Sequence, residues 1–437
     1  MARPLLGPPE IRLPTLPTIS TTTTTNPPMG FTENNSATYL ATGNPCLDFF
    51  FHVVPDTPPE QLVERLVLAW DRNALTSLKL VCNLRGVRGT GKSDKEGFYA
   101  AALYNRDPEY RFLHDRVSDL FAELLKSDME SYRAGELCKI GLAAKWCPNL
   151  DSSFDQATLI CESVARSDSW SIGKGEEREE HDRAGALLPH EIIESLNDWT
   201  GSEVAELQWK RMVDDMAKKG KLTNCMSVCD VSGSMSGIPM EVSVALGLLI
   251  SELSEEPWKG KVITFSANPQ LHTIEGDSLR SKTSFIRRMD WGANTDFQKV
   301  FDRILEVAVE GKLREDQMIK TLFVFSDMEF DQASGSSSYN YYGSGYHHTG
   351  SWETDYTAIQ RKFKEKGYER VPEIVFWNLR NSDATPVPSK QEGVALVSGY
   401  SKNLMTLFLD GEAIMSPEAV MLKAISGEEY QKLVVLD

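Results

Sequence analysis

Oxygen-bearing side chains recur at alternate positions in the segment Asp230-Val231-Ser232-Gly233-Ser234, which follows a run of apolar and β-branched residues. Spacing at i, i+2 and i+4, in a turn that opens into a helix, lets one carboxylate and two hydroxyls converge on one point. These are hard oxygen ligands that suit Mg²⁺, Mn²⁺ or Ca²⁺ and suit zinc poorly. The segment therefore predicts a site for a divalent cation.

Two more oxygen donors are expected at the same place. Thr295 lies in a Gly-Ala-Asn-Thr loop just before a predicted helix, and Asp327 ends the apolar strand TLFVFSD. Ligands of parallel α/β sheets sit beyond the carboxyl ends of the strands. We predict one Mg²⁺ site, with Mn²⁺ or Ca²⁺ as alternatives, formed by Asp230, Ser232, Ser234, Thr295 and Asp327. The simpler interpretation is that one of the two serines only caps the following helix.

Residues 86–93, GVRGTGKS, satisfy the pattern of a phosphate-binding loop. Such a loop needs a buried strand before its glycines and a helix after its Lys-Ser pair, so that backbone N–H groups meet the phosphates. The preceding segment 74–84 has helical periodicity instead, and Asp94 places an anion beside the expected phosphate. We therefore rank a P-loop NTPase last among the alternatives and expect a glycine-rich turn between two helices.

The same turn is locally cationic. Residues 85–95, which include the turn, combine four basic residues with one acid, and the basic residues are Arg85, Arg88, Lys92 and Lys95. A flexible cationic turn on an acidic chain could contact the phosphate backbone of RNA. Pairing with the chain's own carboxylates is the commoner outcome for such a turn.

The overall composition limits the classes of protein. The chain has 437 residues, 46 basic and 63 acidic side chains, a formal charge of −17 and 41% hydrophobic residues, so we expect two or three globular domains. The acidic balance argues against a surface that binds polyanions everywhere, and DNA is not expected as a partner. No stretch approaches the ~18 apolar residues of a membrane span, so we expect no membrane contact. Seven scattered cysteines without a CxxC motif suit a cytoplasmic or nuclear location.

Periodicity predicts an all-α part followed by an α/β part. Amphipathic helices are expected at 58–73, 74–84 and 109–127, whereas strands and helices alternate after Gly220 and predict a parallel, doubly wound sheet. The expected divisions are a disordered tail at 1–30, an α-helical domain at 31–166, a charged linker at 167–183, helices that return to or bridge the helical domain at 184–220, and an α/β domain at 221–437.

DVSGSM, the Gly-Ala-Asn-Thr loop and the strand that ends in Ser-Asp together resemble the von Willebrand factor A domain over roughly residues 221–437. The resemblance implies a Rossmann-like fold and a metal-ion-dependent adhesion site, MIDAS, with the five ligands given above. It also implies one open coordination position, which an acidic group of a partner protein fills.

The segments NPCLDFFFHVVPDTP, LKLVCNLRGVRGTGKSDKEGFYAAALY and AGALLPHEI are similar to an uncharacterised plant and fungal family. In that family a domain of unknown function precedes a von Willebrand A-like module. The layout is similar to that of TROVE-domain, Ro autoantigen-like proteins, which join a ring of HEAT-like helical repeats to the same kind of module. This resemblance implies binding of small or misfolded RNA by the helical part.

We therefore expect a non-enzymatic binding or scaffold protein that recruits an acidic protein partner through Mg²⁺, with a ribonucleoprotein as one setting for it. The alternative is Ro-like binding of small RNA through the helical domain, and the least favoured is an NTPase that uses 86–93. No Ser/His/Asp or Cys/His arrangement is evident, so we predict no catalytic residue.

Overall fold

The computed structural model describes most of the chain. The described residues are 27–34, 37–86, 89–103, 111–136, 139–141, 187–197, 202–266, 268–289, 297–330, 352–411 and 413–435, with the isolated positions 143, 147, 161 and 164. The expected linker 167–183 and most of the expected tail lie outside them. Among the described helices, none combines the length and apolar character needed to cross a membrane.

The N-terminal part is helical, as predicted. Its helices are α1 (Pro45–His52), α2 (Pro59–Arg72), α3 (Ala74–Arg85), α4 (Lys95–Leu103) and α5 (Arg111–Arg133). The helices predicted at 58–73 and 74–84 are confirmed, and the third continues past the predicted 109–127. A short antiparallel hairpin, β1 (Met29–Phe31) and β2 (Ala37–Tyr39), precedes them and was not predicted. Strands of three residues are too short to show the alternation that reveals a strand.

Local chemistry fixes where these helices begin and end. Asn44 caps α1 by accepting a hydrogen bond from the Cys46 backbone, and Asn73 caps α3 by accepting one from Thr76. Gly86 ends α3 in the left-handed region at φ 60°, where glycine carries no Cβ penalty. Helix α3 therefore stops just where the GVRGTGKS turn begins.

Two further helices, α9 (Pro189–Glu194) and α10 (Ser202–Lys219), were expected to return to or bridge the helical part. The structure packs both of them against α11 (Ile238–Leu253) of the α/β part. The indole of Trp209 in α10 donates to Glu252 in α11 at 2.8 Å, which fixes this contact.

The C-terminal part is a six-stranded sheet of order β5-β4-β3-β6-β7-β8. The strands are β3 (Cys225–Cys229), β4 (Lys261–Thr264), β5 (Leu271–Thr273), β6 (Thr321–Ser326), β7 (Glu373–Asn378) and β8 (Val394–Ser398). This order is the 3-2-1-4-5-6 arrangement of doubly wound folds. The α/β architecture is confirmed, but the sheet is mixed rather than wholly parallel, because the short edge strand β5 runs antiparallel to β4.

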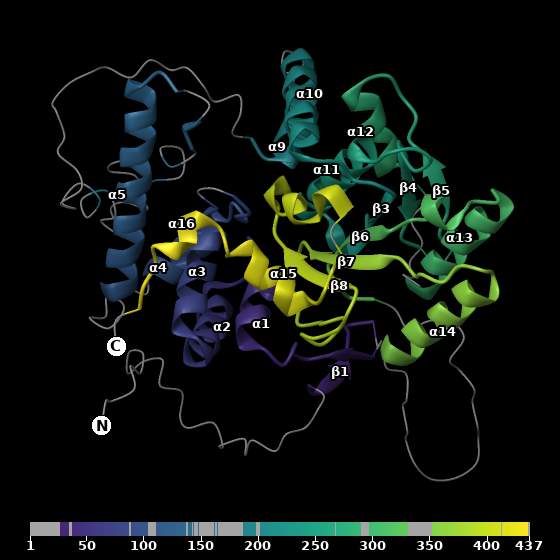
Figure 1. The fold of residues 1–437 in the computed structure, drawn as a ribbon, viewed down its shortest axis with the longest axis horizontal. Helices are drawn as coiled ribbons and strands as arrows, with labels where there is room; N and C mark the ends of the chain where they lie inside the picture. The colour runs from purple at the N-terminus through teal and green to yellow at the C-terminus, as the bar shows by residue number, and fades with distance from the viewer. Residues whose placement is uncertain are drawn as a thin grey trace, which may run out of the picture.

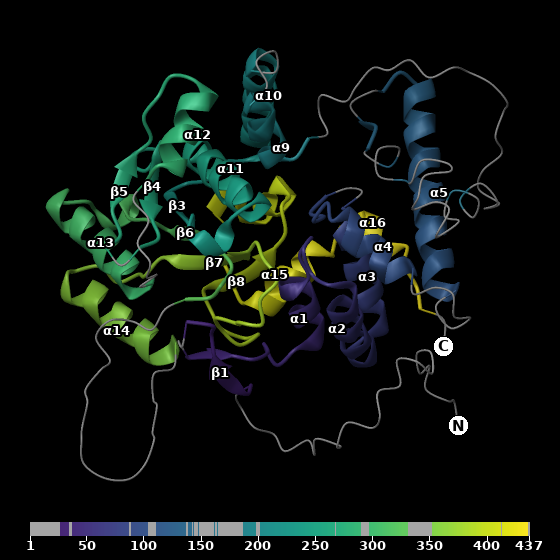
Figure 2. The same cartoon turned by 180° about the vertical axis from the view of Figure 1, so that it is seen from behind.

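Helices cover both faces of this sheet (Figures 1 and 2). Helix α11 packs along β3, β4 and β6, and α15 packs against β8. Besides α11, the helices of this part are α12 (Leu279–Arg287), α13 (Phe297–Glu310), α14 (Trp352–Glu365), α15 (Pro417–Ala424), α16 (Glu428–Gln431) and the 3₁₀ helices η5 (Gly233–Met235), η6 (Glu315–Gln317) and η7 (Lys402–Gly411).

The two parts share a buried interface. Helix α1 lies against β8 and α15, so the N-terminal helices sit beside the β8 edge of the sheet and away from β5 (Figure 1). Buried apolar residues of α1, of the sheet and of the surrounding helices form one continuous core.

Candidate metal centre

Strand pairing brings the two predicted acidic ligands together. Strands β3 and β6 are parallel neighbours in the register Cys229 with Phe325, and the Asp230 backbone donates to Phe325 at 2.9 Å. Asp230 and Asp327 therefore follow the carboxyl ends of adjacent strands. The chain leaves β3 toward β4 on one side and leaves β6 toward β7 on the other, so this is the topological switch point where doubly wound folds bind ligands.

Hydrogen bonds fix the carboxylate of Asp230. One oxygen accepts from the Ser232 backbone at 2.9 Å, and the other accepts from the Ser326 hydroxyl at 2.8 Å. Both predicted acids are buried, with 2% of Asp230 and 4% of Asp327 exposed. Ser326 was not identified from the sequence, although it directly precedes Asp327 and its register opposite Asp230 follows from the parallel pairing.

The two serines of the motif lie side by side. The Oγ atoms of Ser232 and Ser234 are 2.9 Å apart, and Ser234 is exposed to solvent. The residue at the cap position of α11 is Gly237, and no side chain caps that helix. The helix-cap interpretation of the serines is therefore wrong. The Ser232 hydroxyl instead lies between the Asp230 carboxylate and the Ser234 hydroxyl.

The site is electrostatically unfavourable without a cation. Burial, and then the negative charge of Asp327, raise the pKa of Asp230 to about 6. Two buried carboxylates and two adjacent hydroxyls are a hard donor set that fits Mg²⁺, Mn²⁺ or Ca²⁺. In the described residues no group of three or more His, Cys, Asp or Glu gathers into a cluster that could hold a metal. Thr295, the fifth predicted ligand, lies outside the described residues.

The lysine of the GVRGTGKS turn lies inside the protein. Lys92 is 1% exposed, and its ammonium donates to the Phe50 carbonyl, to the Val53 carbonyl at 2.9 Å and to the Ser398 hydroxyl at 2.7 Å. The nitrogen also lies 4.9 Å from the centre of the Phe50 ring. It therefore meets the carboxyl end of α1, where a helix favours a cation. Burial lowers the pKa of Lys92 to about 7.

This placement corrects the expected surface patch. Arg85 is 2% exposed, with its guanidinium 5.7 Å from the centre of the Tyr99 ring, and Arg88 lies outside the described residues. Of the three described residues in the predicted RNA-contacting set, Lys95 alone is exposed. Arg85 and Lys92 are therefore not available to a phosphate backbone.

The turn also lacks the geometry of a phosphate loop. Helix α3 precedes it where a strand is required. The backbone N–H groups of Lys92 and Asp94 donate back to Asn83 at 2.9 Å and to Leu84 at 2.7 Å. Gly86 and Gly91 are in such close contact that a Cβ on Gly91 would lie 1.7 Å from the Gly86 Cα. The described residues 91–94 therefore pack back against the end of α3 instead of opening around an anion.

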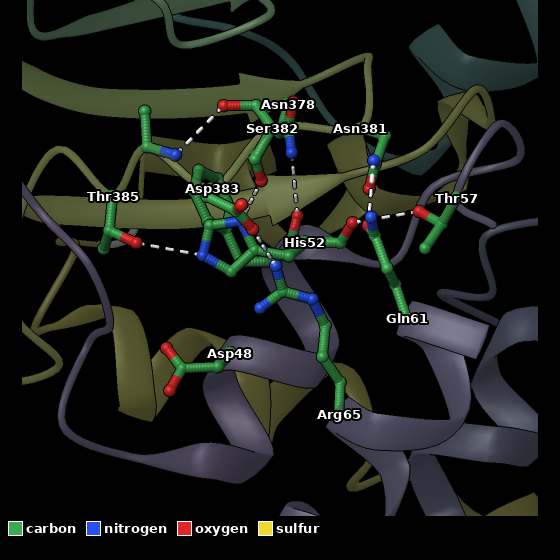
Figure 3. A network of polar contacts seen from close by, with 12 residues as sticks. Asp48, His52, Thr57, Gln61, Arg65, Asn378, Asn381, Ser382, Asp383 and Thr385 are labelled. Atoms are coloured by element: carbon green, nitrogen blue, oxygen red, sulfur yellow. Dashed lines mark hydrogen bonds and ion pairs between the residues drawn. The ribbon is translucent and has the colours of Figure 1, made fainter. Parts of the chain in front are cut away.

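A polar network at the end of β7 was not predicted from the sequence. His52 of α1 places Nδ1 2.9 Å from the Ser382 carbonyl and Nε2 2.9 Å from the Thr385 hydroxyl (Figure 3). Because a carbonyl can only accept, Nδ1 carries the proton and Nε2 accepts from Thr385. Burial lowers the pKa of His52 to about 3, so the ring is neutral. Both side chains are fully buried, so this hydroxyl–imidazole pair joins the two parts instead of facing a substrate.

Further contacts in Figure 3 extend this junction. Arg65 of α2 pairs with Asp383 at 2.6 Å, and the Asn378 amide donates to the Phe51 carbonyl at 3.2 Å. Partners more than 300 residues apart in the chain give no local pattern from which such a junction could be read.

Comparison with known proteins separates the N-terminal helices from the sheet, and α9 and α10 lie between the two matched regions. Residues 224–434 match the domain of unknown function DUF7788, and residues 32–104 and 102–182 match the domain of unknown function DUF2828. The chain therefore carries two domains of unknown function. The DUF7788 match contains the whole sheet and the candidate metal centre, and the DUF2828 match contains α1 to α5.

A viral relative is similar over most of both chains. An uncharacterised protein of Acanthamoeba polyphaga mimivirus is 25% identical over 518 residues, an alignment that covers 91% of this chain and 87% of the viral protein. The relative is thus similar to both parts of this chain and not to the α/β part alone.

Proposed function

We propose that this chain is a metal-dependent binding protein with a von Willebrand A-like adhesion site. Mg²⁺ is held by Asp230, Ser232, Ser234 and Asp327, with Thr295 as the fifth ligand. A partner protein completes the coordination with a carboxylate. The observation that carries this proposal is the pair of buried aspartates at the switch point of the sheet, beside two adjacent serine hydroxyls.

Charge balance supports a cation at this point. A buried carboxylate is costly unless a charge partner or hydrogen bonds compensate it, and two buried neighbours of the same sign are costlier still. Within the described part of the chain, hydrogen bonds from Ser232 and Ser326 offset the charge of Asp230, and no lysine or arginine does so. A divalent cation would neutralise both aspartates at once.

Ligand count supports binding of an external acid. Five protein oxygens leave one position of an octahedral Mg²⁺ open, and a hard anionic oxygen suits that position. The chain carries a formal charge of −17, so its long-range electrostatic field does not attract an acidic partner. The bound ion would be the largest local charge and would make this one point attractive to a carboxylate.

Capture of a partner on the immobilised full-length chain tests this function. We expect a partner that binds in Mg²⁺, dissociates in EDTA and fails to bind Asp230→Ala or Ser234→Ala. Ser236→Ala is the matched control, because Ser236 is exposed nearby but its hydroxyl donates to the Gly233 carbonyl at 2.7 Å. A partner retained equally in Mg²⁺ and in EDTA would contradict the proposal.

A further inference from the structure

The N-terminal hairpin contacts the chain segment that directly follows Asp327. The Thr32 hydroxyl donates to the Phe330 carbonyl at 3.0 Å, and the Asn34 amide donates to the Glu329 carbonyl at 2.7 Å. The Glu33 backbone donates to the Glu329 carboxylate at 2.7 Å. Three consecutive residues of the turn between β1 and β2 therefore hold two consecutive residues beside the candidate metal centre.

Glu329 connects this turn to the predicted ligand. Its backbone N–H donates to Asp327 Oδ1 at 3.1 Å. Its half-buried carboxylate accepts from Glu33 with one oxygen and from the Ser382 hydroxyl at 2.5 Å with the other. The side chain is thus fixed at both oxygens, and the backbone of the same residue orients the carboxylate of Asp327.

The backbone between Asp327 and Glu329 needs support from other parts of the chain. Met328 is buried and has φ 68°, in the left-handed region that non-glycine residues rarely adopt. Such a conformation costs roughly 1–2 kcal/mol and persists where the surrounding structure imposes it. Two hydrogen bonds supply that support: the Met328 N–H donates to the Ser326 hydroxyl at 3.1 Å, and Asn34 of the hairpin donates to the Glu329 carbonyl.

The hairpin is itself anchored to the loop between β7 and β8. Thr385 accepts at its carbonyl from the Tyr39 backbone at 3.1 Å and donates its own N–H to the Tyr39 carbonyl at 3.1 Å. The Thr38 hydroxyl also donates to the Thr385 carbonyl at 3.1 Å. Thr385 is the residue whose hydroxyl meets His52. The hairpin therefore spans from the junction between the two parts to the loop after β6.

We propose that Glu329 is a positioning residue, through which the β1–β2 hairpin holds the Asp327 carboxylate in the orientation that binds the cation. This inference rests on the proposed metal-binding function and deepens it, because it makes cation affinity depend on the N-terminal part. Glu329 acts through Asp327 and is not itself a ligand.

Two substitutions at Glu329 separate positioning from charge. In Glu329→Gln the amide oxygen can accept from Glu33 and the amide nitrogen can donate to the Ser382 oxygen, so both contacts survive without the charge. Glu329→Ala removes both contacts and the charge. If Glu329 acts by position, Gln keeps most of the cation affinity and Ala loses it. If it acts only by charge, both variants lose affinity equally.

Calorimetric titration of the full-length chain with Mn²⁺ measures the effect. Changes in residues that orient metal ligands typically weaken affinity by about 10–100-fold, and we expect a loss of about 10-fold for Glu329→Ala. We expect a smaller loss for Asn34→Ala, which removes the amide bond to Glu329. Asn73→Ala is the matched control, because it removes the cap of α3 at 2.8 Å but touches nothing near the site.

The outcomes separate this inference from the function on which it rests. Absence of Mn²⁺ binding by the wild-type chain would overturn both. Wild-type binding that Asp230→Ala abolishes, combined with unchanged affinity in Glu329→Ala and Asn34→Ala, would overturn this inference alone. Equal losses in Glu329→Gln and Glu329→Ala would also overturn it, in favour of a charge effect. If Glu329→Ala fails to fold, the exposed Asn34→Ala decides the question.

Discussion

The Lys92 ammonium donates to the Ser398 hydroxyl at 2.7 Å and so joins the turn after α3 to the carboxyl end of β8. The same nitrogen meets two carbonyls at the end of α1, so its three donors have three acceptors. A lysine that a sequence pattern assigns to phosphate binding thus connects the N-terminal helices to the sheet.

Replacement of Lys92 tests that connection. Lys92→Met keeps much of the side chain's volume but removes the ammonium that donates to the Phe50 and Val53 carbonyls. The Ser398 hydroxyl lies 2.9 Å from the Phe50 carbonyl and 3.3 Å from the Val53 carbonyl, and its one proton can serve only one of them. The variant therefore leaves one buried carbonyl without a donor, which typically costs about 1–3 kcal/mol. We expect the free energy of unfolding in urea to fall by that amount. Lys95→Met is the control, since Lys95 is exposed three residues later, and its stability should match the wild type. Wild-type stability in Lys92→Met, or loss of ATP binding in that variant, would contradict the structural role.

The close contact of two glycines gives a second test of the turn. A Cβ on Gly91 would lie 1.7 Å from the Gly86 Cα, so Gly91→Ala must displace the backbone that carries Lys92. We expect destabilisation by at least about 2 kcal/mol in urea unfolding. Gly233→Ala is the control, because a Cβ there meets nothing within 4 Å. Both variants are measured with EDTA present. Equal stability of Gly91→Ala and Gly233→Ala would argue against the close packing of Gly86 and Gly91.

His52 gives the protein a specific dependence on pH. Burial lowers the pKa of His52 from its ordinary 6.5 to about 3, so between these values the unfolded chain binds a proton that the folded chain does not. Above pH 6.5 the neutral His52 ring therefore does not reduce the free energy of unfolding. As the pH falls from 6.5 toward 3, the free energy of unfolding decreases by up to about 1.4 kcal/mol per pH unit because of this one residue. We expect His52→Gln to show a shallower fall in the free energy of unfolding over this window. Identical slopes in the two proteins would mean that the imidazole is charged in the folded state.

Ser326 is expected to matter for cation binding although it is not a predicted ligand. Its hydroxyl donates to Asp230 at 2.8 Å and accepts from the Met328 backbone at 3.1 Å, so it orients both sides of the site. We expect Ser326→Ala to weaken Mn²⁺ binding by about 10-fold in calorimetry. Ser227→Ala is the control, since Ser227 is equally buried in β3 but its hydroxyl donates to Gly247. Equal affinities of the two variants would remove Ser326 from the site.

Much of the α/β part could be predicted because its signals are local. Apolar runs that end in an acid located β3 and β6, and parallel pairing then placed Asp230 beside Asp327. The strand β5 and the β1–β2 hairpin were missed because three residues show no usable period. The roles of Lys92, His52 and Glu329 could not be predicted, because each depends on partners that are distant in the chain.

The local sequence pattern also gave a wrong prediction of which charged side chains are exposed. Arg85 and Lys92 stand in a glycine-rich, charged stretch that is typical of an exposed turn, yet both are almost fully covered. Helical periodicity before the turn did argue correctly against a phosphate loop, since α3 occupies the place of the required strand. The carboxyl end of α1 and β8 cover Lys92, and Tyr99 of α4 lies against Arg85. These contacts form only in the tertiary structure.

The most direct test of the central claim is the thermal unfolding of wild-type and Asp230→Asn protein, each measured in EDTA and in Mg²⁺. We predict that Mg²⁺ raises the Tm of the wild type and leaves that of Asp230→Asn unchanged. In EDTA the variant should be at least as stable as the wild type, because it lacks the repulsion between Asp230 and Asp327. A Tm that Mg²⁺ raises equally in both proteins, or in neither, would contradict a metal centre at these residues.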